Sequence, residues 1–236
     1  MAPVAEELCR GHGVLEPLQT KSTIDSQVLE LLGVLRLKAE LPVTLIGHSW
    51  GAWLAFIFAS RYPEMMNKCI LVGAGPFEER YVPVMNETRR KRLTAGERRE
   101  AETLTLALES PGAKNRKEIL KKLGDLIARA DSYDPISIDK ETTDLRPGIF
   151  LPVMKEALEL RKSGALLDMG KNITCPVIAI HGDHDPHPYR GVIDPLSRNI
   201  RLFKPILLTR CGHYPWKERH GRDEFFSILN SELRFA

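Results

Sequence analysis

Short apolar runs alternate with longer stretches of helical spacing along most of the chain. Five of these runs are predicted β-strands, at 14–18, 43–46, 68–72, 177–180 and 205–209. Strands separated by helical stretches are typical of parallel sheets. The pattern therefore predicts an α/β fold with a mostly parallel sheet flanked by helices.

The stretches next to the second strand have helical spacing. Residues 24–37 are predicted to form a helix with Leu29, Leu32 and Leu35 as its apolar stripe. Residues 52–61 are apolar nearly all round, which is typical of a buried helix.

The pattern changes in the middle of the chain, where long charged helical stretches replace strands. The predicted helices of this part are 86–108, 113–130 and 151–161. We expect a core made of residues 1–75 and 171–236, with residues 76–170 inserted as a helical cap.

Length and charge agree with a globular, enzyme-like domain. A chain of 236 residues with 43% hydrophobic residues can bury a large core. The net charge of +3 is small. The basic residues 89–92, 98 and 99 are interleaved with glutamates at 87, 97, 100 and 102, as on a solvated helix face. No apolar run reaches the roughly 18 to 20 residues of a membrane span, and the start lacks a signal-peptide pattern. We expect a cytoplasmic protein with no nucleic-acid and no membrane partner.

No motif predicts a cofactor. Gly73-Ala74-Gly75 follows a predicted strand, but a dinucleotide-binding loop would need a third glycine where Glu78 stands. The four cysteines lack C-x-x-C spacing, which favours free thiols, packed rather than reactive. We therefore expect cofactor-free chemistry.

The pentapeptide Gly47-His48-Ser49-Trp50-Gly51 joins the predicted strand 43–46 to the predicted helix 52–61. A G-x-S-x-G motif between a strand and a helix forms a sharp turn in which the serine has a strained backbone. The flanking glycines, Gly47 and Gly51, would remove Cβ atoms that clash. The motif predicts that Ser49 is an exposed nucleophile.

Two further motifs follow predicted strands. They are His181-Gly182-Asp183-His184-Asp185-Pro186-His187-Pro188 and Cys211-Gly212-His213-Tyr214-Pro215-Trp216. Together with the pentapeptide they resemble the α/β-hydrolase superfamily, whose triad runs Ser, Asp, His along the chain. Within it, the chain is most similar to the capped serine hydrolases around prolyl aminopeptidase. The resemblance implies a helical cap that roofs the active site and selects the substrate.

The chemistry assigns a role to each candidate residue. A serine hydroxyl needs a neighbouring base, so His213 would take the proton of Ser49 and later protonate the leaving group. Asp185 would orient His213 and stabilise its imidazolium form. The backbone N–H of Trp50 would stabilise the oxyanion of the tetrahedral intermediate.

The acid of the triad has alternatives. Asp185 occupies the acid position of the motif H-G-x-x-D-x-x-P, but Asp183 is two residues away. Some members of the superfamily use an acid after the preceding strand, where Glu78 and Glu79 stand. We favour Asp185.

The second oxyanion donor is missing from the expected place. The resemblance implies a His-Gly-rich loop on the order of 60 to 75 residues before the serine, and Ser49 leaves no room for it. Residues 1–9 are predicted to be the helix after that loop, with Arg10-Gly11-His12-Gly13 as a helix-to-strand turn before the strand 14–18. We therefore expect truncated N-terminal strands and half an oxyanion hole.

Three functions follow from these motifs. The leading one is a serine hydrolase acting on an ester, thioester or N-terminal amide bond of a small molecule or short peptide. The second is a catalytically impaired or non-catalytic α/β-hydrolase-like protein. The third is a metal-dependent hydrolase that would use the donors of the 181–187 segment: His181, Asp183, His184, Asp185 and His187.

Overall fold

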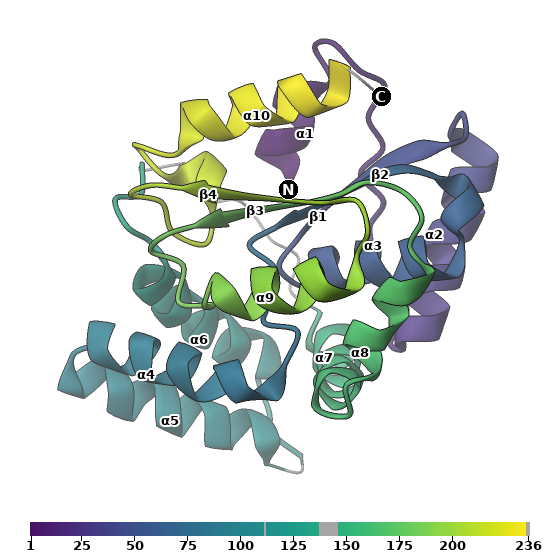
Figure 1. The fold of residues 1–236 in the computed structure, drawn as a ribbon. Helices are drawn as coiled ribbons and strands as arrows, with labels where there is room; N and C mark the ends of the chain where they lie inside the picture. The colour runs from purple at the N-terminus through teal and green to yellow at the C-terminus, as the bar shows by residue number, and fades with distance from the viewer. Residues whose placement is uncertain (111, 137–145, 235–236) are drawn as a thin grey trace.

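The computed structural model describes residues 1–110, 112–136 and 146–234. Four parallel strands form one sheet in the order β1-β2-β3-β4 (Figure 1). The strands are β1 (Val43–His48), β2 (Met66–Val72), β3 (Val177–Gly182) and β4 (Phe203–Leu208). The predicted α/β fold and four of the five predicted strands are confirmed.

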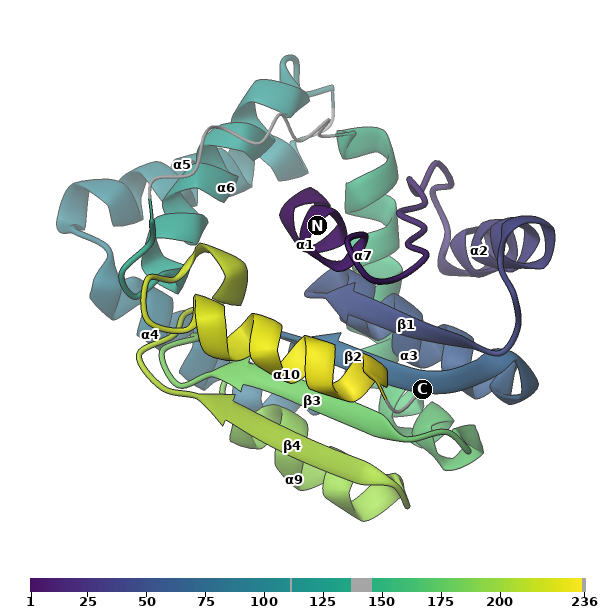
Figure 2. The same ribbon diagram turned by 90° about the horizontal axis from the view of Figure 1, so that it is seen from above.

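Helices cover both faces of the sheet, as Figures 1 and 2 show. The helices α2 (Ile24–Lys38), α3 (Trp50–Arg61) and α9 (Arg190–Asn199) lie on one face, and α1 (Ala2–Leu8) and α10 (Arg222–Arg234) lie on the other. Side chains of β2 alternate between these faces: Cys69 and Leu71 pack with α2 and α3, whereas Ile70 and Val72 pack with α1 and α10. The strand needs apolar residues at every position because both of its faces are covered.

The described parts of the segment between β2 and β3 are mainly helical, as predicted. Its longer helices are α4 (Val82–Arg92), α5 (Ala95–Glu109), α6 (Arg116–Asp131) and α7 (Pro147–Lys162), followed by the short α8 (Ala165–Asp168). The predicted helix 86–108 is two helices, because Thr94 begins α5 with a capping box: its hydroxyl accepts from the N–H of Glu97, whose side chain accepts from the N–H of Thr94. Figures 1 and 2 show α4, α5 and α6 side by side.

The predicted strand at 14–18 is wrong. This segment has no regular secondary structure, and Val14, Leu15 and Leu18 are exposed. A strand needs a ladder partner and a covered face, and β1 is the edge of the described sheet without residues 14–18 beside it. The preceding helix and the turn at 10–13 are found as predicted.

The apolar stripe predicted for α2 is partly wrong. Leu32 and Leu35 are buried, but Leu29 is 59% exposed. The buried face also includes Val28 and Leu31. A three-residue spacing drifts around a helix of 3.6 residues per turn, and the face that packs on α3 follows mixed three- and four-residue spacing instead.

Candidate active site

Ser49 lies in the turn between β1 and α3, with backbone angles φ 54° and ψ −117°. A positive φ is costly for a residue with a side chain, and this one persists because both neighbours are fixed in a strand and a helix. The N–H of Ser49 donates to the carbonyl of Val72 at 3.0 Å. The turn therefore has the strained geometry that the G-x-S-x-G motif predicts.

Only one of the two flanking glycines is sterically required. A Cβ atom on Gly47 would lie 2.0 Å from the carbonyl oxygen of Gly51, whereas a Cβ atom on Gly51 would meet nothing within 4 Å. The expectation that both glycines avoid a clash is therefore right for Gly47 and wrong for Gly51, which lies in the first turn of α3.

This difference gives a matched pair of substitutions. Gly47→Ala should lower the free energy of unfolding by at least about 2 kcal/mol, because the backbone of the turn must move. Gly51→Ala should be neutral or should stabilise by up to about 1 kcal/mol, since alanine favours a helix. Urea unfolding of both variants measures the difference, and equal stabilities would contradict the packing described above.

Asp185 and His213 form a buried pair beyond the carboxyl ends of β3 and β4. The Nδ1 atom of His213 lies 2.7 Å from Oδ2 of Asp185, and the residues are 3% and 7% exposed. A carboxylate only accepts, so Nδ1 carries the proton and Nε2 of a neutral His213 is left as the basic atom. Burial alone would raise the pKa of Asp185, but nearby His213, His187 and His181 hold this pKa well below its ordinary value.

His187 binds the other oxygen of the same carboxylate. Its Nδ1 atom lies 2.7 Å from Oδ1 of Asp185, and its backbone N–H donates to that oxygen at 2.9 Å. The Nε2 atom of His181 donates to the carbonyl of His187 at 2.7 Å. Asp185 is thereby fixed from two sides, and sequence reasoning missed this role of His187 because it treated the residue only as a possible metal ligand.

The other candidate acids bind elsewhere. An oxygen of Asp183 accepts from the backbone N–H of Cys211, Glu78 pairs with Arg80 and Arg198, and Glu79 pairs with Arg161. Asp185, not these residues, is hydrogen-bonded to His213.

His48, inside the pentapeptide, supports the loop of His213. Its Nε2 atom donates to the carbonyl of His213 at 2.9 Å, and its ring packs against those of His213, Tyr214 and Trp216. Burial lowers the pKa of His48 well below its ordinary value. A neutral His48 therefore has a structural role: it connects the Ser49 turn to the loop that carries His213.

The helical insertion is tied to the same loop. The carbonyl of Asp131, at the end of α6, accepts from the N–H of His213 at 2.9 Å, and the Asp131 carboxylate accepts two hydrogen bonds from Arg89 of α4. A Cβ atom on Gly212 would lie 2.3 Å from the Asp131 carbonyl, so the close approach needs glycine there. Asp131 and Arg89 were not predicted, because they are 42 residues apart on two helices and carry no motif.

Ser49 lies at a small pocket between the sheet and the helical insertion. Trp50, Trp53 and His187 line it from the core side, and the pocket volume is ≈ 140 Å³. Within the described residues, no hydrogen bond joins the Ser49 hydroxyl to His213. Such contacts are often long in unliganded enzymes and shorten when substrate binds.

The donors of the 181–187 segment do not converge on one point. His181 donates to a backbone carbonyl, Asp183 accepts from a backbone N–H, and the ring of His184 packs edge-on against Tyr133. Asp185 is shared by two imidazoles. This arrangement argues against the metal site that the sequence allowed.

A different group of possible metal ligands is Asp131, His187 and His213, whose ligand atoms lie within 4.8 Å of one another. The Arg89 guanidinium binds both oxygens of Asp131, at 2.8 and 2.6 Å, and its Nη2 atom is 3.3 Å from Nε2 of His187. A cation beside this guanidinium would be repelled. This geometry argues against a metal ion at these three residues.

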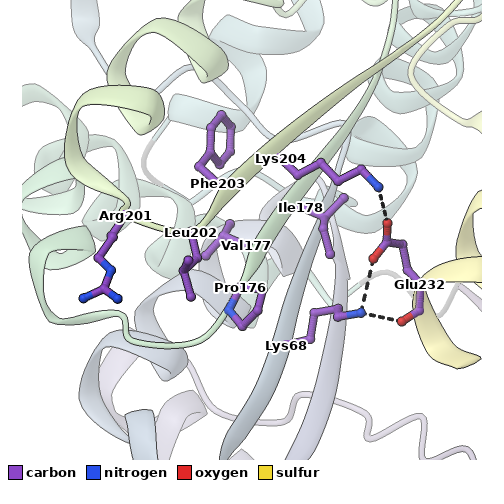
Figure 3. A pocket seen from close by; sticks show the side chains of 9 residues that line it. All are labelled: Lys68, Pro176, Val177, Ile178, Arg201, Leu202, Phe203, Lys204 and Glu232. Atoms are coloured by element: carbon purple, nitrogen blue, oxygen red, sulfur yellow. Dashed lines mark hydrogen bonds and ion pairs between the residues drawn. The ribbon is translucent and has the colours of Figure 1, made fainter. Parts of the chain in front are cut away.

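A second hollow lies at the amino ends of β2, β3 and β4, at the other end of the strands from Ser49 (Figure 3). Lys68 and Lys204 line it and both pair with Glu232, which accepts from Lys204 at 2.7 Å and from Lys68 at 3.2 Å. These three polar groups satisfy one another, so Lys68, Lys204 and Glu232 do not by themselves indicate a ligand site.

The buried histidines predict a loss of stability in mild acid. Burial lowers the pKa of His187 from 6.5 to about 4, and the pKa of His48 is lowered as well. The unfolded chain takes up these protons first, so the free energy of unfolding should fall as the pH falls from 6.5 to about 4. His187 alone should contribute roughly 3 kcal/mol.

Urea unfolding at a series of pH values checks this expectation. His187→Asn should flatten the dependence, whereas the same change at exposed His12 should leave it unaltered. A free energy that stays constant over that pH interval would contradict the buried, neutral state of His187.

Comparisons with known proteins agree with this fold. The family model for the alpha/beta hydrolase fold matches residues 24–187. Comparisons with curated proteins give no match.

Several solved structures share the fold at low sequence identity. A thermophilic esterase from Thermogutta terrifontis is 19% identical, with a TM-score of 0.58 over 99% of this chain and 84% of its own. A proline iminopeptidase from Mycobacterium smegmatis is 16% identical, with a TM-score of 0.58 over 90% and 73%. The protein VinJ is 16% identical, with a TM-score of 0.64 over 90% and 73%.

Proposed function

Because the chain belongs to the alpha/beta hydrolase fold family, we propose that it is a serine hydrolase that cleaves an ester, thioester or amide bond through an acyl-enzyme. Ser49 is the nucleophile, His213 the base and later the acid, and Asp185 the group that orients His213. The observation that carries the proposal is the buried Asp185–His213 hydrogen bond at the same end of the sheet as the strained Ser49 turn.

The proposed steps move one proton and one acyl group. Nε2 of His213 takes the hydroxyl proton while Oγ of Ser49 attacks the carbonyl carbon, and the backbone N–H of Trp50 stabilises the oxyanion. His213 then gives the proton to the leaving group, and water repeats the sequence to release the acid. Asp185 stays ionised throughout and stabilises the imidazolium.

A fluorophosphonate probe tests the proposal directly. We expect one probe per chain, attached to Ser49 on mass-spectrometric mapping, and a much slower reaction in His213→Ala because the hydroxyl then lacks a base. Labelling of another serine, or no labelling of natively folded protein, would contradict the assignment.

A catalytically impaired protein is the second candidate. It is favoured by the absence, within the described residues, of a hydrogen bond from Ser49 to His213, and by the single oxyanion donor that the motifs supply. Loss of one such donor typically lowers turnover about 10²–10³-fold. Slow stoichiometric labelling with turnover reduced to this extent would indicate an impaired enzyme.

Residues 76–170 are proposed to act as the cap of the core formed by 1–75 and 171–236. The lining of the Ser49 pocket supports this role as a cap, because five of its residues belong to α4 and α7: Met85, Arg89, Met154, Leu158 and Arg161.

The location in the cell and the partners stay predictions. None of the helices in the described parts of the chain combines the length and apolarity needed to cross a bilayer. The cytoplasmic location, the small-molecule or short-peptide substrate and the expectation of no nucleic-acid and no membrane partner rest on the sequence.

A further inference from the structure

We propose that Arg161 binds a carboxylate of the substrate, so that the preferred substrates are small anionic esters or amides. The inference rests on the serine hydrolase function proposed above and deepens it. It starts from the charges that surround the Ser49 pocket.

Two helices of the insertion present arginines to this pocket. Met85 and Arg89 are four residues apart on α4, and Leu158 and Arg161 are three apart on α7, so each pair lies on one face of its helix. An apolar side chain and a guanidinium therefore come from each helix. The pocket is lined by no acidic side chain among the residues that the structure describes.

Arg161 has donors to spare. Its Nε atom donates to Oε2 of Glu79 at 2.9 Å, and the guanidinium lies over the ring of Trp53, 5.7 Å from its centroid. In the described chain, neither Nη atom of Arg161 makes a hydrogen bond, although the side chain is only 7% exposed. A planar guanidinium with both Nη groups unused at a pocket is well suited to a carboxylate, which accepts two parallel hydrogen bonds.

Trp53 fixes the position of this guanidinium. Its Nε1 atom donates to the carbonyl of Gly75 at 3.1 Å, and a Cβ atom on Gly75 would lie 2.8 Å from the Trp53 ring. The indole is thus held by a hydrogen bond and by close packing. A positioned donor loses little side-chain entropy on binding, which strengthens recognition of an anion.

Arg89 is held in place, and the carboxylate of Asp131 compensates its charge. Two of its N–H groups are bound to Asp131, and its Nη2 atom is 3.3 Å from His187. Arg161, whose Nη groups are unused, is therefore the residue that contacts the substrate carboxylate. A guanidinium only donates, so it cannot accept a hydrogen bond from the ammonium group of a peptide N-terminus, which makes an aminopeptidase the weaker form of the proposed function.

The pocket limits the size of the anion. Its volume of ≈ 140 Å³ is close to that of an engineered cavity that holds benzene, so the group inside has about six heavy atoms. The charged arm of a short half-ester, a carboxylate on a three-carbon chain, has this size, and its ester group would then lie at Ser49.

Two measurements separate the charge preference from catalysis. Calorimetry with glutarate reports binding of the anion without turnover. Rates of hydrolysis are compared within two matched pairs of esters. Monomethyl glutarate against methyl pentanoate tests a charge on the acyl side, and 4-acetoxybutanoate against butyl acetate tests a charge on the alcohol side. Within each pair a carboxylate replaces a methyl group.

Arg161→Met keeps the bulk of the side chain and removes its charge, whereas Arg161→Lys keeps the charge and loses the planar fork. We expect Arg161→Met to weaken glutarate binding about tenfold or more and to lower the anionic-to-neutral ratio of kcat/KM by a similar factor. Arg161→Lys should retain part of the glutarate affinity and part of the preference for the anionic ester. Glu79→Gln is the matched control, since it removes the partner's charge and should strengthen glutarate binding or leave it unchanged.

The outcomes distinguish the two proposals. Glutarate binding that depends on Arg161 supports the anion site even if no ester is cleaved and Ser49 is not labelled, in which case the serine hydrolase function fails. Ser49-dependent cleavage that favours the neutral ester of both pairs overturns the anion site and leaves the hydrolase. Equal glutarate binding by natively folded Arg161→Met, or no binding by the unaltered protein, also overturns it.

Discussion

Ser49→Ala should lower the rate of ester hydrolysis by about 10⁶-fold and abolish fluorophosphonate labelling, because the acyl-enzyme cannot form without the hydroxyl oxygen. Alanine meets the same positive φ as serine at this position, so the strained turn is not altered by the change. The unfolding free energy should therefore change little. The measurement is kcat/KM on a matched ester, with the urea midpoint as a check on the fold.

Ser60→Ala is the matched control. Ser60 lies near the C-terminal end of α3, the helix that begins directly after Ser49. It is buried, and its hydroxyl donates to the carbonyl of Ile57 at 2.7 Å. Its loss should cost about 1 kcal/mol of stability and leave kcat/KM unchanged. If Ser49→Ala kept a tenth or more of the activity while still folded, another group would be the nucleophile and the proposed mechanism would be wrong.

The parts of the site that local chemistry determines could be predicted from the sequence. A strand, five residues and a buried helix define the Ser49 turn. The strained backbone expected for Ser49 is found as a positive φ. Asp185 was favoured over Asp183 from its place in one motif, and the structure joins Asp185 to His213. Spacing within a motif fixes which side chain follows the strand, so these relations need no knowledge of the rest of the fold.

The strand expected at 14–18 shows where such reasoning stops. Its short apolar run satisfied the local pattern, but a strand also requires a neighbour, and residues 14–18 lie outside the ladder of β1 to β4. The helix expected at 86–108 failed for another reason, since the capping box of Thr94 and Glu97 outweighs helical spacing that continues across it.

The contacts between distant helices could not be predicted. Arg89 was interpreted as part of a solvated basic face, yet it donates hydrogen bonds to buried Asp131 and contacts His187. Arg161 ends an amphipathic pattern without a motif and points to the Ser49 pocket. Which residue of a charged helix faces inward depends on how the insertion sits on the core, and one sequence does not contain that information.

Asp185→Asn should lower kcat by about 10⁴-fold with a smaller effect on KM, because the amide no longer holds the imidazole of His213 in the tautomer that leaves Nε2 basic. The substitution also replaces the carboxylate to which His187 is hydrogen-bonded, so the variant should lose a moderate amount of stability. The pH-rate profile is the decisive readout, since a merely structural loss would lower the rate equally at every pH.

Asp183→Asn is the control two residues away. Asp183 is exposed and accepts from the N–H of Cys211, a bond that the amide oxygen of asparagine can keep. The rate of Asp183→Asn should stay within about threefold of the rate of the unaltered protein. Glu78→Gln should behave likewise, because Glu78 pairs with Arg80 and Arg198 rather than with His213. Equal losses in Asp183→Asn and Asp185→Asn would mean that the carboxylate bonded to His213 is not the acid of the triad. A loss confined to Asp185→Asn would tie the buried imidazole–carboxylate pair to the chemistry of Ser49.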